Sequence, residues 1–424
     1  MKYAKFGLAM VMAIVVWGGF VFAALDQGWG HSPIATTGDS NAFELAAHDI
    51  AEQRNSGNVS FVLTEDGLPV ADFHLSVGEP VDKRAVFQVA SLGKWLTALG
   101  VMVLVEEGTV DLDKPVSTYL SRWQFPASDF DASGVTVRRL LSHTAGLTDG
   151  LGYNGFDSAA DRQSLEASLT KATDAAPGKD GKTIIGAKPG SRWEYSGGGY
   201  TLMELLIEEV SGTSFPEFMR DRVFTPLDMD RTTFDHAKAI ELGLAENFRP
   251  DGSTEPFRWY TAQAATSLFT TSQDLAIFTS AQAPGSTNPV LSSDAMALMR
   301  TPHASEMGAD IWGLGVMLYA PNNAGDFIIG HDGSNEPAIN TAARFDPMTG
   351  DGIVVLATGD PTLATEIAGE WVFWNTGNVD SLTFASRLPI AIATFVAGAI
   401  TLLFGGILIV WLARRNRRNL ARHK

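Results

Sequence analysis

The sequence predicts an α+β fold, in which an antiparallel sheet is formed from both ends of the domain and carries flanking helices and an inserted helical subdomain, with additional N- and C-terminal membrane helices. Strand-like runs lie at both ends of the chain's central body, within residues 58–76 and 312–359. The stretch between, about 109–285, mixes helical patterns with Gly- and Pro-containing loops. Two long uncharged apolar segments lie outside the body. Strands at both ends with helices between them fit one sheet assembled from both termini.

The apolar segments come first and last in the chain. Residues 6–25 hold twenty residues without a charge, and residues 388–413 hold twenty-six. Roughly 20 apolar residues span a bilayer core, so both segments qualify. Residues 1–25 therefore form an N-terminal signal anchor or a signal peptide. The apolar run exceeds the ~7–15 residues usual for a signal peptide, which favours the uncleaved anchor. Residues 388–413 are predicted to be a transmembrane helix.

Both tails beyond these segments are basic. Lys2 and Lys5 precede the first segment, and six Arg or Lys residues lie in the tail 414–424, with no acidic residue in either tail. Basic flanks face the cytoplasm, so residues 414–424 form a basic cytoplasmic tail, and the body lies on the extracytoplasmic (periplasmic) side of the cell membrane. Membrane lipid is then a partner of both terminal helices. The second segment also has small side chains at four-residue spacing, which either let another helix approach or arise by chance: Ala393, Ala397, Thr401 and Gly405.

Composition excludes several classes of function. The chain of 424 residues has no cysteine, which rules out disulfides, thiolate metal sites and cysteine nucleophiles. The whole chain carries a net charge of −17, and the body is more acidic still because the tails are basic. Such a body repels phosphate backbones, so no nucleic-acid partner is expected. No HExxH, Walker loop or Rossmann fingerprint occurs, and neither a metal nor an organic cofactor is expected.

Between the tails, residues 26–40 are a linker rich in Gly, Ser, Thr and Pro, and residues 41–376 form one domain. A helix is predicted over 41–54. The run "NVSFVLTEDGLPVADFHLS" then predicts a hairpin that turns at Asp66-Gly67. "RAVFQVAS" leads into the next helix, and four strand-like runs with short turns close the domain.

The stretch "QVASLGKWLTALGVMVLVEEG", residues 88–108, contains a lysine in an otherwise apolar helix. Ser91 and Lys94 are three residues apart and so share a helix face. A serine hydroxyl needs a base, and an ammonium cannot accept a proton, but burial among apolar side chains lowers the pKa of a lysine by several units. The pair therefore predicts a nucleophile and its base. An N-cap serine with a snorkelling lysine is the alternative.

The same four-residue pattern occurs a second time. Ser168 and Lys171 lie in "DSAADRQSLEASLTKATDAAP", a polar helix with nothing to desolvate the lysine. This copy is interpreted as a solvated helix face. The pattern Ser-x-x-Lys is therefore weak evidence by itself.

Longer sequence motifs around and after Ser91 and Lys94 provide further evidence for the role of this first copy. "FQVASLGKWLTALGVMVLVEEGTVDLDKPVSTYL" closely resembles the serine β-lactamase and penicillin-binding-protein superfamily, in particular its class C-like branch. "VTVRRLLSHTAGL", "PGSRWEYSGGGYTLMELLIEEVSG", "AATSLFTTSQDLAIF" and "IGHDGSNEPAINTAARFDPMTGDGIVVLA" follow in the family's order. The resemblance covers residues 43–373, and it implies that residues 41–376 are a β-lactamase-like serine hydrolase domain.

The resemblance also implies roles. Ser91 matches the acylated nucleophile and Lys94 its partner, while Tyr195 of "EYSGGG" matches the tyrosine of the Tyr-x-Asn motif. A cationic Lys94 would lower the pKa of Tyr195, so either group is a candidate base. His331-Asp332-Gly333 takes the place of the Lys-Thr-Gly strand motif. The N–H groups of Ser334 and Ser91 would form the oxyanion hole.

For other residues of these motifs we expect structural roles, or we note departures from the family's pattern. His143 of "LLSHTAGL" is expected to stabilise a loop. A core aromatic remains the alternative for Tyr195, and a structural strand histidine the alternative for His331. Gly197 stands where many relatives have asparagine. His331 and Asp332 replace groups that bind a substrate carboxylate, and a neutral imidazole beside a carboxylate receives anions poorly.

These residues predict a membrane-tethered serine hydrolase that forms an acyl-enzyme and acts on a small-molecule or peptide substrate with an ester or amide bond. Because an anion receptor is missing from the motif, β-lactam hydrolysis is not expected to be the main activity. A catalytically silent receptor for peptidoglycan or a protein partner is one alternative. A D,D-peptidase or β-lactamase is another.

Overall fold

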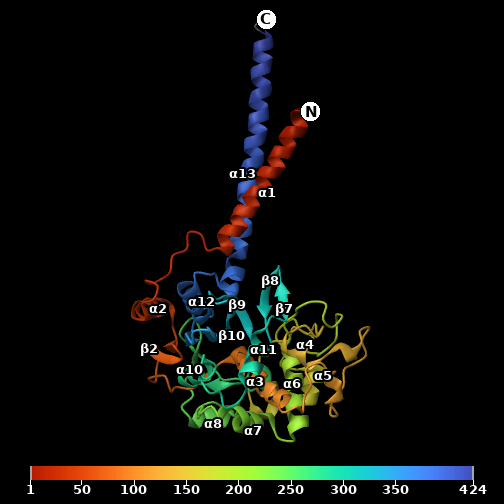
Figure 1. Ribbon diagram of the computed structural model, residues 1–424, viewed down its shortest axis with the longest axis vertical. Coiled ribbons are helices and arrows are strands. Elements are labelled where there is room, and N and C mark those ends of the chain that lie inside the picture. The colour runs from red at the N-terminus through yellow and green to blue at the C-terminus, as the bar shows by residue number, and fades with distance from the viewer. Residues whose placement is uncertain (1, 423–424) are drawn as a thin grey trace. The chain divides into compact units, whose positions relative to one another are not determined.

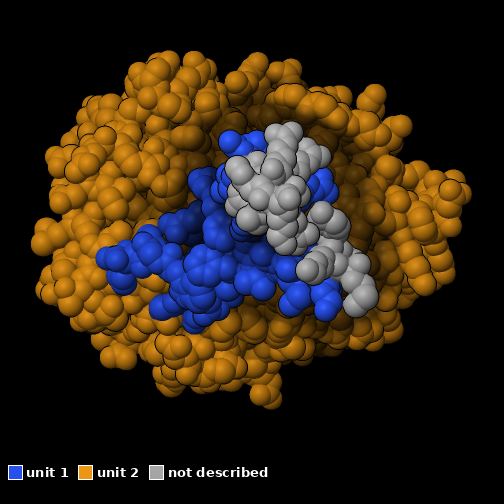
Figure 2. Space-filling view, turned by 90° about the horizontal axis from the view of Figure 1, so that it is seen from above, with its two compact units in different colours: residues 1–33, 377–424 blue, residues 34–376 orange. Residues whose placement is uncertain are grey.

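The computed structural model describes residues 2–422, and the side chains of residues 5–415 (Figure 1). The side chains of Lys2 and of the tail residues beyond 415, which the sequence assigns to basic cytoplasmic tails, lie outside the described residues. The chain divides into two compact units, residues 34–376 and residues 1–33 together with 377–424, shown in different colours in Figure 2.

The larger unit is built on one eight-stranded sheet in which every adjacent pair of strands is antiparallel. The strand order is β2-β1-β12-β11-β10-β9-β8-β7. β1 from the start of the domain pairs with β12 from its end, so the predicted sheet formed from both ends is confirmed. The strands are β1 (Val59–Glu65), β2 (Leu68–Leu75), β7 (Ala304–Glu306), β8 (Ala309–Trp312), β9 (Met317–Pro321), β10 (Phe327–Asn335), β11 (Ile339–Phe345) and β12 (Gly352–Thr358).

The turn between β1 and β2 is at the predicted position. Asp66 and Gly67 both have positive φ, 49° and 74°. Two central residues of positive φ match the right-handed twist of the flanking strands, which is why Asp-Gly closes tight hairpins. The short strands β7 and β8 at the opposite edge were not predicted, because three or four residues carry too little alternation to be recognised.

Helices cover both faces of the sheet. α2 (Ser40–Arg54) and α12 (Leu363–Thr376) pack on one face, and α10 (Ser272–Ser280) packs against β1 and β12 on the other. α2 begins where the sequence predicts a helix, because the Asp39 side chain accepts a hydrogen bond from the Ala42 N–H.

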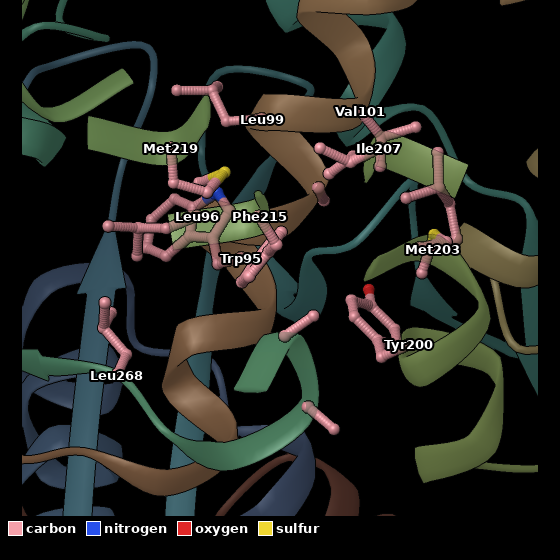
Figure 3. Packing of buried hydrophobic residues seen from close by; sticks show 14 of the residues in the cluster. Trp95, Leu96, Leu99, Val101, Tyr200, Met203, Ile207, Phe215, Met219 and Leu268 are labelled. Carbon is pink, nitrogen blue, oxygen red and sulfur yellow. The ribbon is translucent and has the colours of Figure 1, made fainter. Parts of the chain in front are cut away.

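The inserted helical subdomain packs around α3 (Gly93–Glu106), whose residues 93–104 are all buried. Figure 3 shows Trp95, Leu96 and Leu99 of this helix beside Phe215 and Met219, with Met203 and Ile207 on its other side. Its other helices are α4 (Val137–Leu141), α5 (Leu165–Lys171), α6 (Gly197–Ser211), α7 (Phe215–Met219), α8 (His236–Glu241), α9 (Gln263–Thr266) and α11 (Ser293–Arg300); two small sheets pair β3 (Phe87–Gln88) with β6 (Phe269–Thr270) and β4 (Asn247–Phe248) with β5 (Thr254–Glu255).

The smaller unit contains two helices that are long and apolar enough to cross a membrane, α1 (Lys2–Asp26) and α13 (Ser381–Arg422). The two helices contact each other, and Trp17 Nε1 donates to the Phe395 carbonyl at 3.1 Å. A Cβ at Gly398 would lie 2.1 Å from Nε1 of the Trp17 indole of α1, so this glycine permits the close approach. The strip of small residues noted in the sequence is exposed and is not this contact face: Ala393, Ala397, Thr401 and Gly405.

Candidate functional site

Ser91 lies in a short 3₁₀ turn, Ala90–Leu92, directly before α3. Ala90 has a φ of 48°, in the left-handed region that an alanine adopts only under strain. The Lys94 side chain points back toward this turn, and its Nζ lies 3.0 Å from Ser91 Oγ. Ser91 is half-buried, whereas Lys94 is only 2 % exposed. The two groups are therefore at hydrogen-bond distance, with the lysine on the buried side.

Burial determines the charge of Lys94. Desolvation lowers the pKa of its amine to about 7, so the neutral form is well populated at neutral pH. The second partner of Nζ is the Ala265 carbonyl on α9. Thr97 donates to the neighbouring Ala264 carbonyl at 3.1 Å, and the Glu204 carboxyl accepts from the Ala264 N–H at 2.8 Å. The α9 backbone is thus held firmly where it meets the lysine.

Tyr195 lies at the same site, directly before Ser196, which is the N-cap residue of α6. Its ring centroid is 5.1 Å from Lys94 Nζ, and its hydroxyl hydrogen-bonds with Ser91. The expectation that Lys94 lowers the pKa of Tyr195 is wrong, because burial raises the pKa of this phenol above its usual value and the bond to Ser91 offsets only part of the effect. Of the two groups, Lys94 is the one whose pKa lies near neutrality.

The loop that carries Tyr195 is anchored at the start of α6. Ser196 Oγ accepts from the Gly199 N–H at 2.9 Å and donates to Asp149 at 2.6 Å. Asp149 also accepts from the Gly198 N–H at 3.1 Å. Asp149 was not predicted from the sequence; the only signal was an acidic residue in the glycine-rich loop after "LLSHTAGL". A buried carboxylate at a helix N-terminus satisfies backbone N–H groups that would otherwise lack partners.

Gly197, the first residue of α6, leaves no room for the asparagine found in many relatives. A Cβ there would lie 2.1 Å from the Leu151 carbonyl oxygen and 3.0 Å from the Tyr153 ring. We expect Gly197→Asn to lower the free energy of unfolding by about 1–3 kcal/mol, the usual cost of overpacking a core. Thermal melting of the detergent-solubilised protein measures this effect.

Gly212 at the other end of α6 provides the control. It has a φ of 70°, and no atom lies within 4 Å of the position that a Cβ would take. Asparagine tolerates this backbone conformation. Gly212→Asn should leave the melting temperature nearly unchanged. Equal melting of the Gly197→Asn protein and the unsubstituted protein would contradict the steric argument.

β10 brings His331-Asp332-Gly333 close to the turn that holds Ser91. Among the described residues, β9 pairs with β10 only as far as Gly330, and the turn that holds Ser91 packs against β10. His331 is buried there, and its Nδ1 donates to the Asp332 carbonyl at 2.6 Å. Burial, helped by nearby Lys94, lowers the pKa of His331 to about 3. The ring is therefore uncharged at neutral pH, and it puts no cation where the motif's lysine would stand.

Gly333 sets how closely β10 approaches the turn that holds Ser91. A Cβ at Gly333 would lie 1.9 Å from the Val89 carbonyl oxygen. Thr341 on β11 donates to the same carbonyl at 2.9 Å, which ties the sheet to the residues before Ser91. Ser334, the next residue of β10, is exposed and pairs with Asn340 in the ladder. Ser334 is thus the residue directly after Gly333, where β10 comes closest to the turn that holds Ser91.

Asp332 faces away from this site. Its carboxylate pairs with buried Arg344, and it accepts from Tyr319 Oη at 2.8 Å and from Thr365 Oγ1 at 2.6 Å. Successive strand residues point to opposite faces, so Asp332 lies on the α12 side when His331 lies on the α3 side. The expectation that a carboxylate stands beside the imidazole in the pocket is therefore wrong, whereas His331 indeed supplies no cation.

The second Ser-x-x-Lys copy differs from the first. Lys171 is exposed, as expected for a solvated face, but Ser168 is buried at 1 % exposure. The interpretation was right for the lysine and wrong for the serine, because α5 turns that side chain into the subdomain. With its lysine in solvent, this copy does not bring a buried amine to its serine.

Two cavities of the larger unit are not lined by Ser91. One of about 180 Å³ lies past the end of β10 and is lined by residues that include Gln88, Tyr260 and Asn335. The other, about 960 Å³, lies between α7 and α8 and includes none of the sequence-predicted site residues. A grouping of metal-ligand type among the described residues, His48, Asp49 and Glu52 on α2, is likewise separate from Ser91.

Comparison with known proteins agrees with this geometry. The family model described as Beta-lactamase matches residues 43–372. "Penicillin-binding protein 4*" of Bacillus subtilis is 32 % identical over 158 residues, which cover 36 % of this chain and 31 % of that protein. The matched part thus spans under half the length of this curated relative.

Solved structures show the same fold. The octameric penicillin-binding protein homologue from Pyrococcus abyssi is 24 % identical with a TM-score of 0.63, over 83 % of this chain and 77 % of that one. A D-stereospecific amidohydrolase from Streptomyces sp. is 21 % identical with a TM-score of 0.58, over 78 % and 98 %. Because the family model matches most of the chain and these structures share its fold, the protein belongs to the Beta-lactamase family.

Proposed function

We propose that the protein is a membrane-tethered serine hydrolase that cleaves an ester or amide bond through an acyl-enzyme. The observation that carries the proposal is the distance of 3.0 Å between Ser91 Oγ and Lys94 Nζ, in surroundings that lower the pKa of the amine to about 7. A hydroxyl next to a base that is neutral at working pH is the arrangement that nucleophilic catalysis requires.

The proposed reaction has two halves. Ser91 Oγ attacks the carbonyl carbon while its proton passes to neutral Lys94, and the negative charge develops on the carbonyl oxygen. The backbone N–H groups of Ser91 and Ser334 stabilise that oxygen. Lys94 then returns the proton through the Tyr195 hydroxyl to the leaving alcohol or amine. Water repeats the sequence on the acyl-serine and releases the acid.

The substrate is proposed to lack a free carboxylate near the scissile bond. His331 is neutral, and Asp332, with its partner Arg344, faces the other side of β10. The alternative of a D,D-peptidase or β-lactamase is suggested by penicillin-binding relatives. Turnover of a cephalosporin with kcat/KM near ~10⁶ M⁻¹s⁻¹, well inside the enzymatic range, would favour that alternative.

The membrane arrangement is part of the proposal. Two apolar helices suggest membrane association. We propose that residues 1–25 and 388–413 anchor the chain in lipid, that 26–40 is a linker, that 41–376 is the extracytoplasmic hydrolase domain, and that 414–424 lies in the cytoplasm, since basic flanks face that side.

A fluorophosphonate probe tests the nucleophile on the full-length protein in detergent. The hydroxyl of an activated serine attacks the phosphorus of the probe and displaces fluoride, so we expect labelling of the unsubstituted protein and none of Ser91→Ala. Ser168→Ala is the matched control, because it removes the buried serine of the second Ser-x-x-Lys copy and should label normally. If folded protein shows no Ser91-dependent labelling, the hydrolase proposal fails and the silent receptor is favoured. A screen of p-nitrophenyl esters, D-amino-acid amides and cephalosporins would then identify the substrate class.

A further inference from the structure

The backbone on both sides of Tyr195 is bound to a single residue, His143. The Glu194 N–H donates to the His143 carbonyl oxygen at 2.8 Å. The Ser196 N–H donates to His143 Nδ1 at 3.1 Å. Tyr195 therefore lies between two hydrogen bonds that end on the same residue, one on its main chain and one on its side chain.

The His143 ring also packs on the Tyr195 ring. The ring centroids are 4.4 Å apart, and His143 is 2 % exposed. Trp312 packs edge-on against the His143 ring, with a centroid 4.8 Å away, and also contacts the Tyr195 ring at 5.8 Å. Close packing of this kind leaves the imidazole little freedom, so a side chain that rests on it is confined as well.

The backbone conformation of His143 makes the two hydrogen bonds compatible. Its φ is 55°, in the left-handed region, where histidine, asparagine and aspartate are enriched among residues other than glycine. In this conformation the carbonyl meets Glu194 while the ring reaches Ser196. A residue without a side-chain acceptor can make only the first of these bonds.

The protonation state of the His143 ring is compatible with its hydrogen bond from the Ser196 N–H. Because Nδ1 accepts a hydrogen bond, the ring is the neutral tautomer with its proton on Nε2. Burial lowers the pKa of His143 well below its usual value, with nearby Lys94 and His331 as further causes. The bond to Ser196 is therefore not lost by protonation of the ring near neutral pH.

We infer that His143 is a positioning residue for Tyr195: by bonding to the backbone before and after it and packing on its ring, His143 holds the phenol hydroxyl against Ser91. The inference rests on the proposed function, because it concerns the proton path of that reaction. A displacement of about 1 Å in a reacting group can cost about 10²-fold in rate. Loss of the clamp should therefore slow acylation of Ser91 without removing any group that reacts.

Two substitutions separate this role from general stability. We expect His143→Ala to slow fluorophosphonate labelling of Ser91 by about 10²-fold in the full-length protein. His143→Asn should restore most of the rate, because asparagine tolerates positive φ and its Oδ1 supplies an acceptor close to the position of Nδ1.

The matched control is His236→Ala, which removes another buried histidine that packs on aromatic rings, 5.2 Å from Phe269, but does not contact Tyr195. It should label at the normal rate even where its melting temperature falls. Labelling of His143→Ala at the normal rate, equal slowing of the Asn and Ala variants, or equal slowing of His236→Ala would overturn the inference.

Hydrogen exchange measured by mass spectrometry tests the clamp without any reaction. The peptide containing residues 194–196 should exchange slowly in the unsubstituted protein, faster in His143→Ala, and slowly in His143→Asn and His236→Ala. Unchanged exchange in His143→Ala would show that the clamp does not hold the loop. If the unsubstituted protein does not label at all, the hydrolase proposal fails, and the exchange rates still decide whether His143 holds Tyr195.

Discussion

Lys94→Met is expected to slow acylation of Ser91 by about 10²–10⁴-fold, the usual contribution of a general base. Methionine is unbranched and apolar, so it fills the buried space of the lysine stem without its amine. Ser91 and Tyr195 keep their positions, but the phenol cannot replace the base because burial raises its pKa above the usual value. The rate of fluorophosphonate labelling measures the loss, because attack on the probe's phosphorus needs the same deprotonation of the Ser91 hydroxyl.

The pH dependence follows from the same group. The pKa of Lys94 is lowered to about 7, so below that pH the folded protein carries an ammonium that cannot accept a proton. The labelling rate of the unsubstituted protein should rise about tenfold per pH unit below 7 and level off above it. In Lys94→Met the residual rate should lose this step.

Thr97→Val is the matched control for the lysine. Thr97 lies one turn further along α3, is fully buried, and donates to the α9 carbonyl next to the one that Lys94 contacts. Its replacement removes a hydrogen bond to the same segment but no base, so the rate should change little. A Lys94→Met protein that labels as fast as Thr97→Val would rule out the amine as the base.

Gly333→Ala is expected to reduce acylation by about 10²–10³-fold, as removal of one oxyanion donor does in other hydrolases. The new methyl group would lie 1.9 Å from the Val89 carbonyl oxygen and 2.4 Å from Thr341 Oγ1. The Val89 carbonyl belongs to the backbone and cannot yield locally, so β10 must separate from the turn that holds Ser91. The Ser334 N–H moves away with the strand, and overpacking lowers stability by about 1–3 kcal/mol.

Labelling rate and melting temperature together check this result. Gly152→Ala serves as the control, because the nearest atom to its new methyl group is Ala176 Cβ at 3.6 Å, an ordinary contact. It should label and melt normally. If Gly333→Ala labels at the normal rate, the N–H of Ser334 is not a donor to the oxyanion.

Several parts of the fold could be predicted from local patterns. The hairpin at Asp66-Gly67, the helix that follows Asp39 and the order of strands around a helical insertion all follow from turn chemistry, capping and periodicity. The edge strands β7 and β8 were not predicted because they are too short to show an alternation of apolar and polar residues. The orientation of Asp332 was predictable in principle, since adjacent strand residues face opposite sides, but His331 and Asp332 were interpreted as one surface.

Some residues of the site are placed together by local sequence, and others come together only in the folded chain. Ser91 and Lys94 are three positions apart, so the chain alone places them on one face, and the apolar residues that follow predict the lowered pKa of the amine. The groups that surround Tyr195 and Lys94 are distant in sequence. His143 and Asp149 bind Ser196, the α9 backbone binds Lys94, and these groups meet only when the subdomain closes on α3. Burial in that closure also raises the pKa of the phenol, which no local pattern shows.

Local sequence therefore determined the longer strands, the hairpin turn and the placement of Ser91 beside Lys94, because each depends on neighbours within a few residues. Only long-range packing decided which side of β10 faces Ser91, why glycine is required at 197 and 333, and which residues contact the loop of Tyr195. These features depend on desolvation and on contacts between atoms far apart along the chain, and both exist only in the folded protein.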